Sequence, residues 1–227
     1  VGAGRTEIMQ SVFGAMQTDS GEVVLGDRRL DIRGVTDAID SGIALVPEDR
    51  KREGLVTQMT MGENICLPNL MEIQRAGHIL KGKSSRLVNT YMEKLAIRPN
   101  LPGRAVNEFS GGNQQKAVIS KWLATNPQII IFDEPTRGVD VGAKTEIYHL
   151  IAQLSEQGVA IVFVSSELME ILGMCDRILV IHEGVISGEF FAEEATQEKL
   201  MRAAAGYHRE ETVPAGQVGP VAPGQAT

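Results

Sequence analysis

Residues 129–135 read Ile129-Ile130-Ile131-Phe132-Asp133-Glu134-Pro135, an apolar run that ends in two acids and a proline. An apolar run without polar alternation is typical of a parallel strand that is buried on both faces. A second such run covers 159–164, and apolar residues between the two follow a helical spacing, at 147, 150, 151 and 154. Gly158 stands where that helix is expected to stop. This order predicts a β-α-β crossover and an α/β domain with a mostly parallel sheet.

The two acids at the end of the first run suit phosphoryl chemistry. Neighbouring side chains on a strand point in opposite directions. Asp133 can therefore hold Mg²⁺, directly or through water, while Glu134 can orient and deprotonate an attacking water. We interpret Asp133 as a metal ligand and Glu134 as the catalytic base. For this motif alone, a strand that simply ends in a polar turn is the alternative.

A glycine-rich turn opens the chain. Val1-Gly2-Ala3-Gly4-Arg5-Thr6 matches the end of the pattern G-x-x-x-x-G-K-[ST], with Arg5 where lysine is expected. Such a turn before a helix brings backbone N–H groups to phosphate oxygens and places the Thr6 hydroxyl for Mg²⁺. Arginine can bind phosphate, but its planar fork does not reproduce the point charge of lysine. An ordinary glycine turn before a helix is the alternative. We expect nucleotide contacts from Gly2, Ala3, Gly4, Arg5 and Thr6.

A third motif lies upstream of the acids, Glu108-Phe109-Ser110-Gly111-Gly112-Asn113-Gln114-Gln115-Lys116. Ser110 suits a helix N-cap, and the glycine pair keeps the first N–H groups of the following helix open to an anion. A bare helix cap needs only one small neighbour, so the glycine pair favours a binding loop.

The three motifs in this order resemble those of the ATP-binding-cassette ATPases, which implies a P-loop NTPase fold with ATP and Mg²⁺ as cofactors. Ser110, Gly111 and Gly112 then correspond to the signature loop, and Gly138-Val139-Asp140 corresponds to the D-loop. Glu48 stands where the family carries the Q-loop glutamine, and Ser166 where it carries the switch histidine. The resemblance assigns nucleotide contacts to these further residues: Glu48, Ser110, Gly111, Gly112, Asp140 and Ser166.

Three phrases, 46–52, 109–116 and 133–144, resemble the second cassette of the two-cassette ATPases of monosaccharide importers. In this family, nucleotide lies between the P-loop of one cassette and the signature loop of the other. Arg5, Glu48 and Ser166 all weaken the half-site of this chain's own P-loop, whereas the signature loop is intact. The resemblance implies that the chain mainly completes the catalytic site of its partner, and that it couples ATP hydrolysis to sugar import.

The same resemblance implies three partners: a second cassette, membrane permease subunits and, indirectly, a sugar-binding protein. It implies a peripheral location on the cytoplasmic face of the inner membrane. A regulatory nucleotide-binding module without significant turnover is one alternative. A nucleic-acid-linked cassette ATPase is another, against which the net charge of −7 argues. The basic run Arg50-Lys51-Arg52 is flanked by acids, so we interpret it as a solvated turn.

The remaining patterns predict how the chain is organised. Two short strands joined by Gly26-Asp27 predict a hairpin, and a second pair turns at Glu183-Gly184 before a final helix over 194–205. We expect a P-loop core over 1–58 and 106–206, an inserted helical subdomain over 59–105 and a flexible tail over 207–227. The chain begins with Val1 inside a motif, so we expect it to belong to a longer protein.

Overall fold

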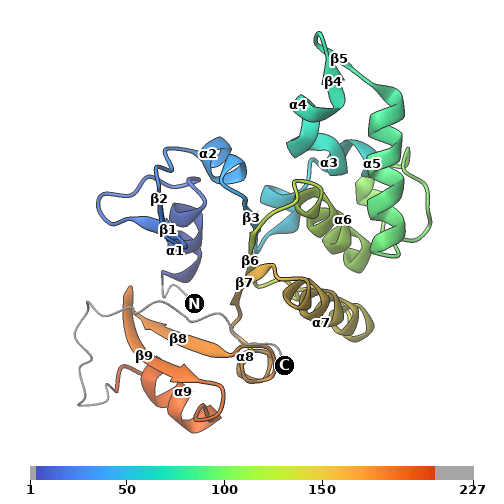
Figure 1. Ribbon diagram of the computed structural model, residues 1–227. Helices are drawn as coiled ribbons and strands as arrows, with labels where there is room; N and C mark the ends of the chain where they lie inside the picture. The colour runs from blue at the N-terminus through green and yellow to red at the C-terminus, as the bar shows by residue number, and fades with distance from the viewer. Residues whose placement is uncertain (1–3, 208–227) are drawn as a thin grey trace, which may run out of the picture.

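The computed structural model describes residues 4–207, and at its centre lies a three-stranded parallel sheet (Figure 1). The strands are β3 (Ile43–Val46), β6 (Ile129–Asp133) and β7 (Ala160–Val164), in the order β3-β6-β7. Strand β6 pairs on both sides, and its Ile130, Ile131 and Phe132 are at most 1% exposed. The parallel strands and the α/β class predicted from the sequence are confirmed.

The helices that carry the motifs begin after a glycine or at a capping side chain. Helix α1 (Arg5–Val12) starts after Gly4, whose φ of 86° is left-handed and suits glycine. Helix α6 (Gly111–Leu123) starts at the N-cap Ser110, and α7 (Val141–Glu156) at the N-cap Asp140. The apolar face predicted for the crossover helix is buried as expected, with Ile147, Ile151 and Leu154 inside. A short helix, α2 (Val35–Asp40), leads into β3.

Two antiparallel hairpins flank this core, as the turn residues predict. Strands β1 (Val23–Leu25) and β2 (Arg28–Leu30) pair across Gly26-Asp27, where Gly26 has a φ of 59°. Strands β8 (Arg177–His182) and β9 (Val185–Phe191) pair across Glu183-Gly184. Helix α8 (Leu168–Met174) precedes them, and α9 (Gln197–Ala204) follows and packs on them through a second apolar cluster. The final helix therefore begins three residues later than predicted, because Thr196 caps it.

The segment 59–105 is mainly helical and contains no buried strand. It holds α3 (Met61–Cys66), α4 (Leu70–Ile73) and α5 (Lys81–Lys94), with a two-residue-strand hairpin, β4 (Gln74–Arg75) and β5 (His78–Ile79), between the last two. Apolar residues of α3 and α5 join the same core cluster as the sheet strands. Its treatment as a separate subdomain stays a prediction. The predicted tail lies, but for residue 207, outside the described residues.

Candidate functional site

Asp133 ends β6 beside the first turn of α1. Its side chain is buried, with 2% of the residue exposed, and its Oδ1 has no hydrogen-bond partner within residues 4–207. Burial raises the pKa of Asp133, while the nearby Thr6 hydroxyl and the charge of Arg5 lower it. An orphaned carboxylate oxygen beside a threonine hydroxyl is the donor set that Mg²⁺ uses when substrate phosphates supply its other ligands. The pair therefore fits the predicted metal.

Two further carboxylates, which sequence reasoning did not single out, influence the pKa of Asp133. The charges of Glu53 and Glu7 both raise its pKa. Glu7 follows Thr6 in the first turn of α1, and Glu53 lies in the π-helical turn η1 (Arg50–Gly54) after β3. Both add negative charge around the predicted phosphate site, and their effect disfavours an anion there unless a cation is also bound.

Arg5 and Glu134 are brought together at the same edge. Arg5 Nη2 lies 3.7 Å from Glu134 Oε1, and Arg5 Nη1 donates a hydrogen bond of 2.8 Å to the carbonyl of Ser165. Glu134 has a left-handed φ of 47°, and its N–H continues the sheet by donating to the carbonyl of Val164. The predicted base is therefore ion-paired to the residue that replaces the P-loop lysine. Ser166, the next residue after Ser165, is exposed.

We call this group of five residues the P-loop cluster: Arg5, Thr6, Asp133, Glu134 and Ser165. Gly4 leads into it at the N-cap of α1, whereas the predicted contacts Gly2 and Ala3 lie outside the described residues.

A buried carboxylate supports the P-loop cluster from behind. Glu170, on α8, is 6% exposed and accepts hydrogen bonds from Ser165 Oγ at 2.6 Å, Thr136 Oγ1 at 2.7 Å and the Tyr148 hydroxyl. Lys144 Nζ lies 3.4 Å away. Burial acts to raise the pKa of Glu170, but these donors and the lysine charge together lower it. Sequence reasoning missed this residue, because nothing local marks a carboxylate whose partners lie on three other segments.

The glycines of the signature loop lie where a side chain would collide. Ser110 is exposed and caps α6 by accepting from the N–H of Asn113. A Cβ on Gly112 would lie 2.8 Å from the Cβ of Ala143, so only glycine allows α6 to approach the start of α7 this closely. Asp140 accepts from the N–H of Ala143 at 3.0 Å, so in this structure the predicted D-loop contact caps a helix.

Glu48 pairs with the turn that follows β6. It forms an ion pair with Arg137, two residues beyond the Glu134-Pro135 pair. Its neighbour Arg50 donates to the carbonyls of Arg137 and Gly138. We call this second group the signature cluster: Glu48, Arg50, Ser110, Gly111, Arg137 and Gly138. Among residues 4–207, no hydrogen bond or ion pair joins its side chains to Arg5, Thr6 or Asp133.

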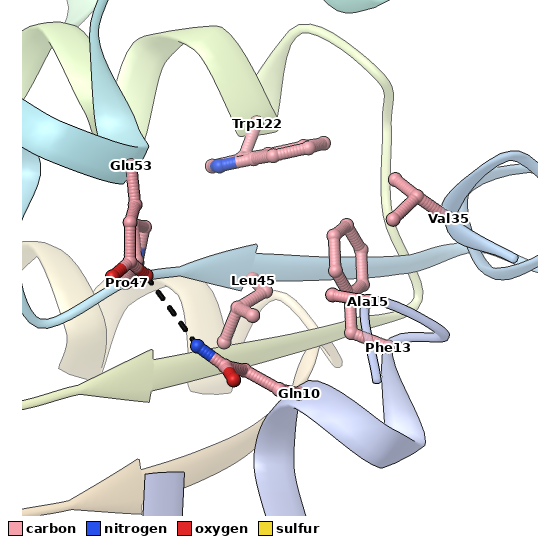
Figure 2. Close-up of a pocket in the computed structure, with 8 residues that line it drawn as sticks. All are labelled: Gln10, Phe13, Ala15, Val35, Leu45, Pro47, Glu53 and Trp122. Carbon is pink, nitrogen blue, oxygen red and sulfur yellow. Dashed lines mark hydrogen bonds between the residues drawn. The ribbon is translucent and has the colours of Figure 1, made fainter. Parts of the chain in front are cut away.

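A separate hollow of about 390 Å³ lies between α1, β3, η1 and α6 (Figure 2). Phe13 and Trp122 meet edge to face there, with ring centroids 5.3 Å apart, and Leu45 lies below them. The indole Nε1 of Trp122 has no hydrogen-bond partner within the described part of the chain. Gln10 donates to Glu53 at one end of the hollow. The hollow thus lies outside both clusters, and its aromatic side chains are themselves buried.

The family model described as "ABC transporter" matches residues 1–137. The chain belongs to the ABC transporter family. It is 51% identical over 207 residues to the ribose import ATP-binding protein RbsA of Oceanobacillus iheyensis, and 50% identical over 207 residues to the xylose import ATP-binding protein XylG of Thermoanaerobacter pseudethanolicus. Each alignment covers 91% of this chain but only 42% and 41%, respectively, of those proteins. The chain therefore spans about two fifths of the length of these curated ABC relatives.

Solved structures of ABC cassettes share the fold. An ATP-binding cassette of an ABC transporter matches with a TM-score of 0.74 and 20% identity, over 88% of this chain and 83% of that one. A cassette dimer in a post-hydrolysis state, bound to ADP and phosphate, matches with a TM-score of 0.71 and 23% identity, over 84% of this chain and 81% of that one. The P-loop NTPase core predicted from the sequence is thereby confirmed.

Proposed function

We propose that this chain is the second ATPase cassette of a monosaccharide importer, and that its signature loop completes a catalytic site on the P-loop of a partner cassette. The observation that carries the proposal is the contrast between the two clusters. The P-loop cluster has its base paired to Arg5, whereas Ser110 is exposed at the start of a glycine-led helix. The kinship with ribose and xylose import ATP-binding proteins supports a pentose or related sugar as cargo.

In this proposal the residues of the chain have distinct tasks. Ser110 and the first N–H groups of α6 bind the phosphate of a nucleotide that sits on the partner's P-loop, since a helix N-terminus favours anions. Thr6 and Asp133 would hold Mg²⁺, which would neutralise phosphate charge in this chain's own half-site. Glu134, whose Oε1 lies 3.7 Å from Arg5 Nη2, would be the base that accepts a proton from water there. Because Arg5, Glu48 and Ser166 replace the residues that the family uses, we expect the turnover of this half-site to be weak.

Turnover measurements with and without the partner test the proposal directly. We expect the chain alone to be mostly monomeric and to hydrolyse ATP very slowly, and turnover to appear when the partner cassette is added. A tight ATP-dependent homodimer of this chain with robust turnover would contradict it. Slow turnover that the partner does not raise would favour the regulatory module, for which the Arg5–Glu134 ion pair is the supporting observation.

The membrane contact belongs, in our proposal, to the helical segment 60–105, with the chain held peripherally on the cytoplasmic face of the membrane. Within residues 4–207, no helix is both long and apolar enough to cross a bilayer. Met71 and Leu70 on α4 are 80% and 38% exposed, so they offer an apolar surface for a permease segment.

Substitution of these exposed side chains tests the docking surface. We expect Met71→Asp to uncouple sugar uptake while nucleotide binding stays unchanged. Met169→Asp is a matched control, because Met169 is 72% exposed but lies on α8. Equal uptake by both variants would place the permease contact elsewhere.

A further inference from the structure

Arg50 lies where three loops meet that are far apart in the sequence. It is the first residue of the η1 turn after β3. Its Nη1 donates to the carbonyl of Arg137 at 3.0 Å, and its Nη2 donates to the carbonyl of Gly138 at 3.1 Å. A Cβ on Gly111 would lie 3.0 Å from the same Nη2. One guanidinium therefore contacts the D-loop turn and the start of α6 together.

The rest of the basic run behaves differently. Lys51 and Arg52 are exposed, and their side chains make no hydrogen bond or ion pair to any residue between 4 and 207. Only Arg50 turns inward. The interpretation of the run as a solvated turn therefore holds for two of its residues and is wrong for Arg50, whose partners are backbone carbonyls that no sequence pattern marks.

The turn that Arg50 holds is shaped for this contact. Gly138 has a φ of 66°, which other residues rarely adopt, and a Cβ there would lie 3.8 Å from both terminal nitrogens of Arg50. Glu48, from the same loop as Arg50, pairs with the side chain of Arg137. Arg50 thus holds the Arg137–Gly138 turn through two backbone carbonyls. Glu48, from the same loop, holds it through the charge of the Arg137 side chain.

The hydrogen bonds of Arg50 use only the two terminal nitrogens of its guanidinium. Its Nε is buried and has no hydrogen-bond partner within the described residues, and a buried donor without a partner destabilises the folded state. The planar fork instead meets two adjacent carbonyls at once, which the single ammonium of a lysine does not reproduce.

We infer that Arg50 is a positioning residue, which fixes the Arg137–Gly138 turn, and with it Asp140 at the start of α7, against Gly111 at the start of α6. It acts through these loops and is not a catalytic residue. The inference goes beyond the proposed function, because it concerns contacts within this chain. Movement of the loop that carries Glu48 would then be passed to the D-loop and to the signature loop at the same time.

Hydrogen exchange of the chain tests the positioning without a partner. In Arg50→Ala, we expect the amides of residues 137–143 to exchange about tenfold faster, because local opening costs less free energy. The amides of β6 should be unchanged. Arg52→Ala is the matched control from the same basic run and should match the parent chain, while Arg50→Lys should be intermediate. Equal exchange in Arg50→Ala and Arg52→Ala would overturn the inference, and so would faster exchange throughout the sheet, which indicates general destabilisation.

Turnover of the ATPase assembled with its partner cassette gives a second readout. We expect Arg50→Ala to lower kcat about tenfold with little change in the KM for ATP, since misplaced groups slow the reaction more than they weaken binding. An unchanged kcat, or a rise in KM alone, would overturn the positioning role. Because the exchange experiment needs only this chain, a failure of the proposed cassette partnership is distinguishable from a failure of the Arg50 inference.

Discussion

The P-loop cluster and the signature cluster lie on one chain but differ in what their key groups are free to do. In the P-loop cluster, Arg5 engages both Glu134 and Ser165, and the buried Glu170 holds Ser165 from behind. In the signature cluster, protein contacts hold Arg137 and Gly138, while Ser110 remains exposed at a helix N-terminus. Both clusters therefore keep an ordered local structure, but only the signature cluster leaves its key side chain, Ser110, exposed.

The largest effect should come from the support of the P-loop cluster. Glu170→Ala leaves three hydroxyls and the Lys144 ammonium without their shared buried acceptor. We expect a loss of about 3 kcal/mol in unfolding free energy, measured by denaturant titration. Glu167→Ala is the control, because Glu167 also pairs with Lys144 but is exposed. Equal losses of unfolding free energy in the two variants would contradict the expectation that the buried Glu170 carboxylate contributes more than an exposed one.

The stability contribution of Glu170 should also depend on pH. Its pKa is lowered in the folded state, so its contribution is present above the unfolded pKa and is lost as pH falls through the folded one. The difference in unfolding free energy between the parent chain and Glu170→Gln should therefore narrow as pH falls from about 6 to about 3. A constant difference would contradict the sign of this shift.

The next effect concerns the signature cluster in the assembled ATPase. Gly111→Asp puts bulk and negative charge where a partner's nucleotide phosphate is proposed to bind, and we expect steady-state turnover to fall by about 10²-fold or more. The new carboxylate would also face Arg50, whose Nη2 lies 3.0 Å from the Cβ position. Gly111→Ala separates the two causes, because it adds bulk without charge and should cost less.

The smallest effect should come from the base of the P-loop cluster. Glu134→Gln should reduce the same turnover only about threefold or less, against the roughly 10²- to 10⁴-fold that a working general base contributes. The reason is that this base belongs to the half-site already weakened at Arg5, Glu48 and Ser166. If Glu134→Gln were as damaging as Gly111→Asp, this cassette's own half-site would be a principal catalytic one.

Local sequence was enough to predict the elements that depend on local signals. The apolar runs predict β6 and β7, the glycine turns predict both hairpins, and Ser110 is predicted as a helix cap. The three-residue error at the start of α9 has a local cause as well, because Thr196 was not recognised as the cap.

What the sequence could not predict depends on contacts between distant segments. Long-range contacts of this kind are those of Arg50 with Arg137, of Glu170 with Thr136 and of Arg5 with Glu134. In each pair the two residues are at least 34 positions apart in the sequence. Asp140 was predicted to contact nucleotide, and in this structure its side chain caps α7. The roles assigned to the site residues stay predictions, because each needs a bound nucleotide and a facing cassette.

The hollow of Figure 2 contains an intrinsic fluorescent probe. Trp122 is the only tryptophan in the 227 residues, and its ring lines that hollow beside Phe13. The ammonium of Lys121 lies 5.1 Å from the centre of the indole, so the excited state of this single fluorophore is sensitive to any rearrangement there. Intrinsic emission, with no label and no substitution, therefore reports on one defined place in the fold, and a rearrangement of the hollow changes the wavelength and intensity of the emission.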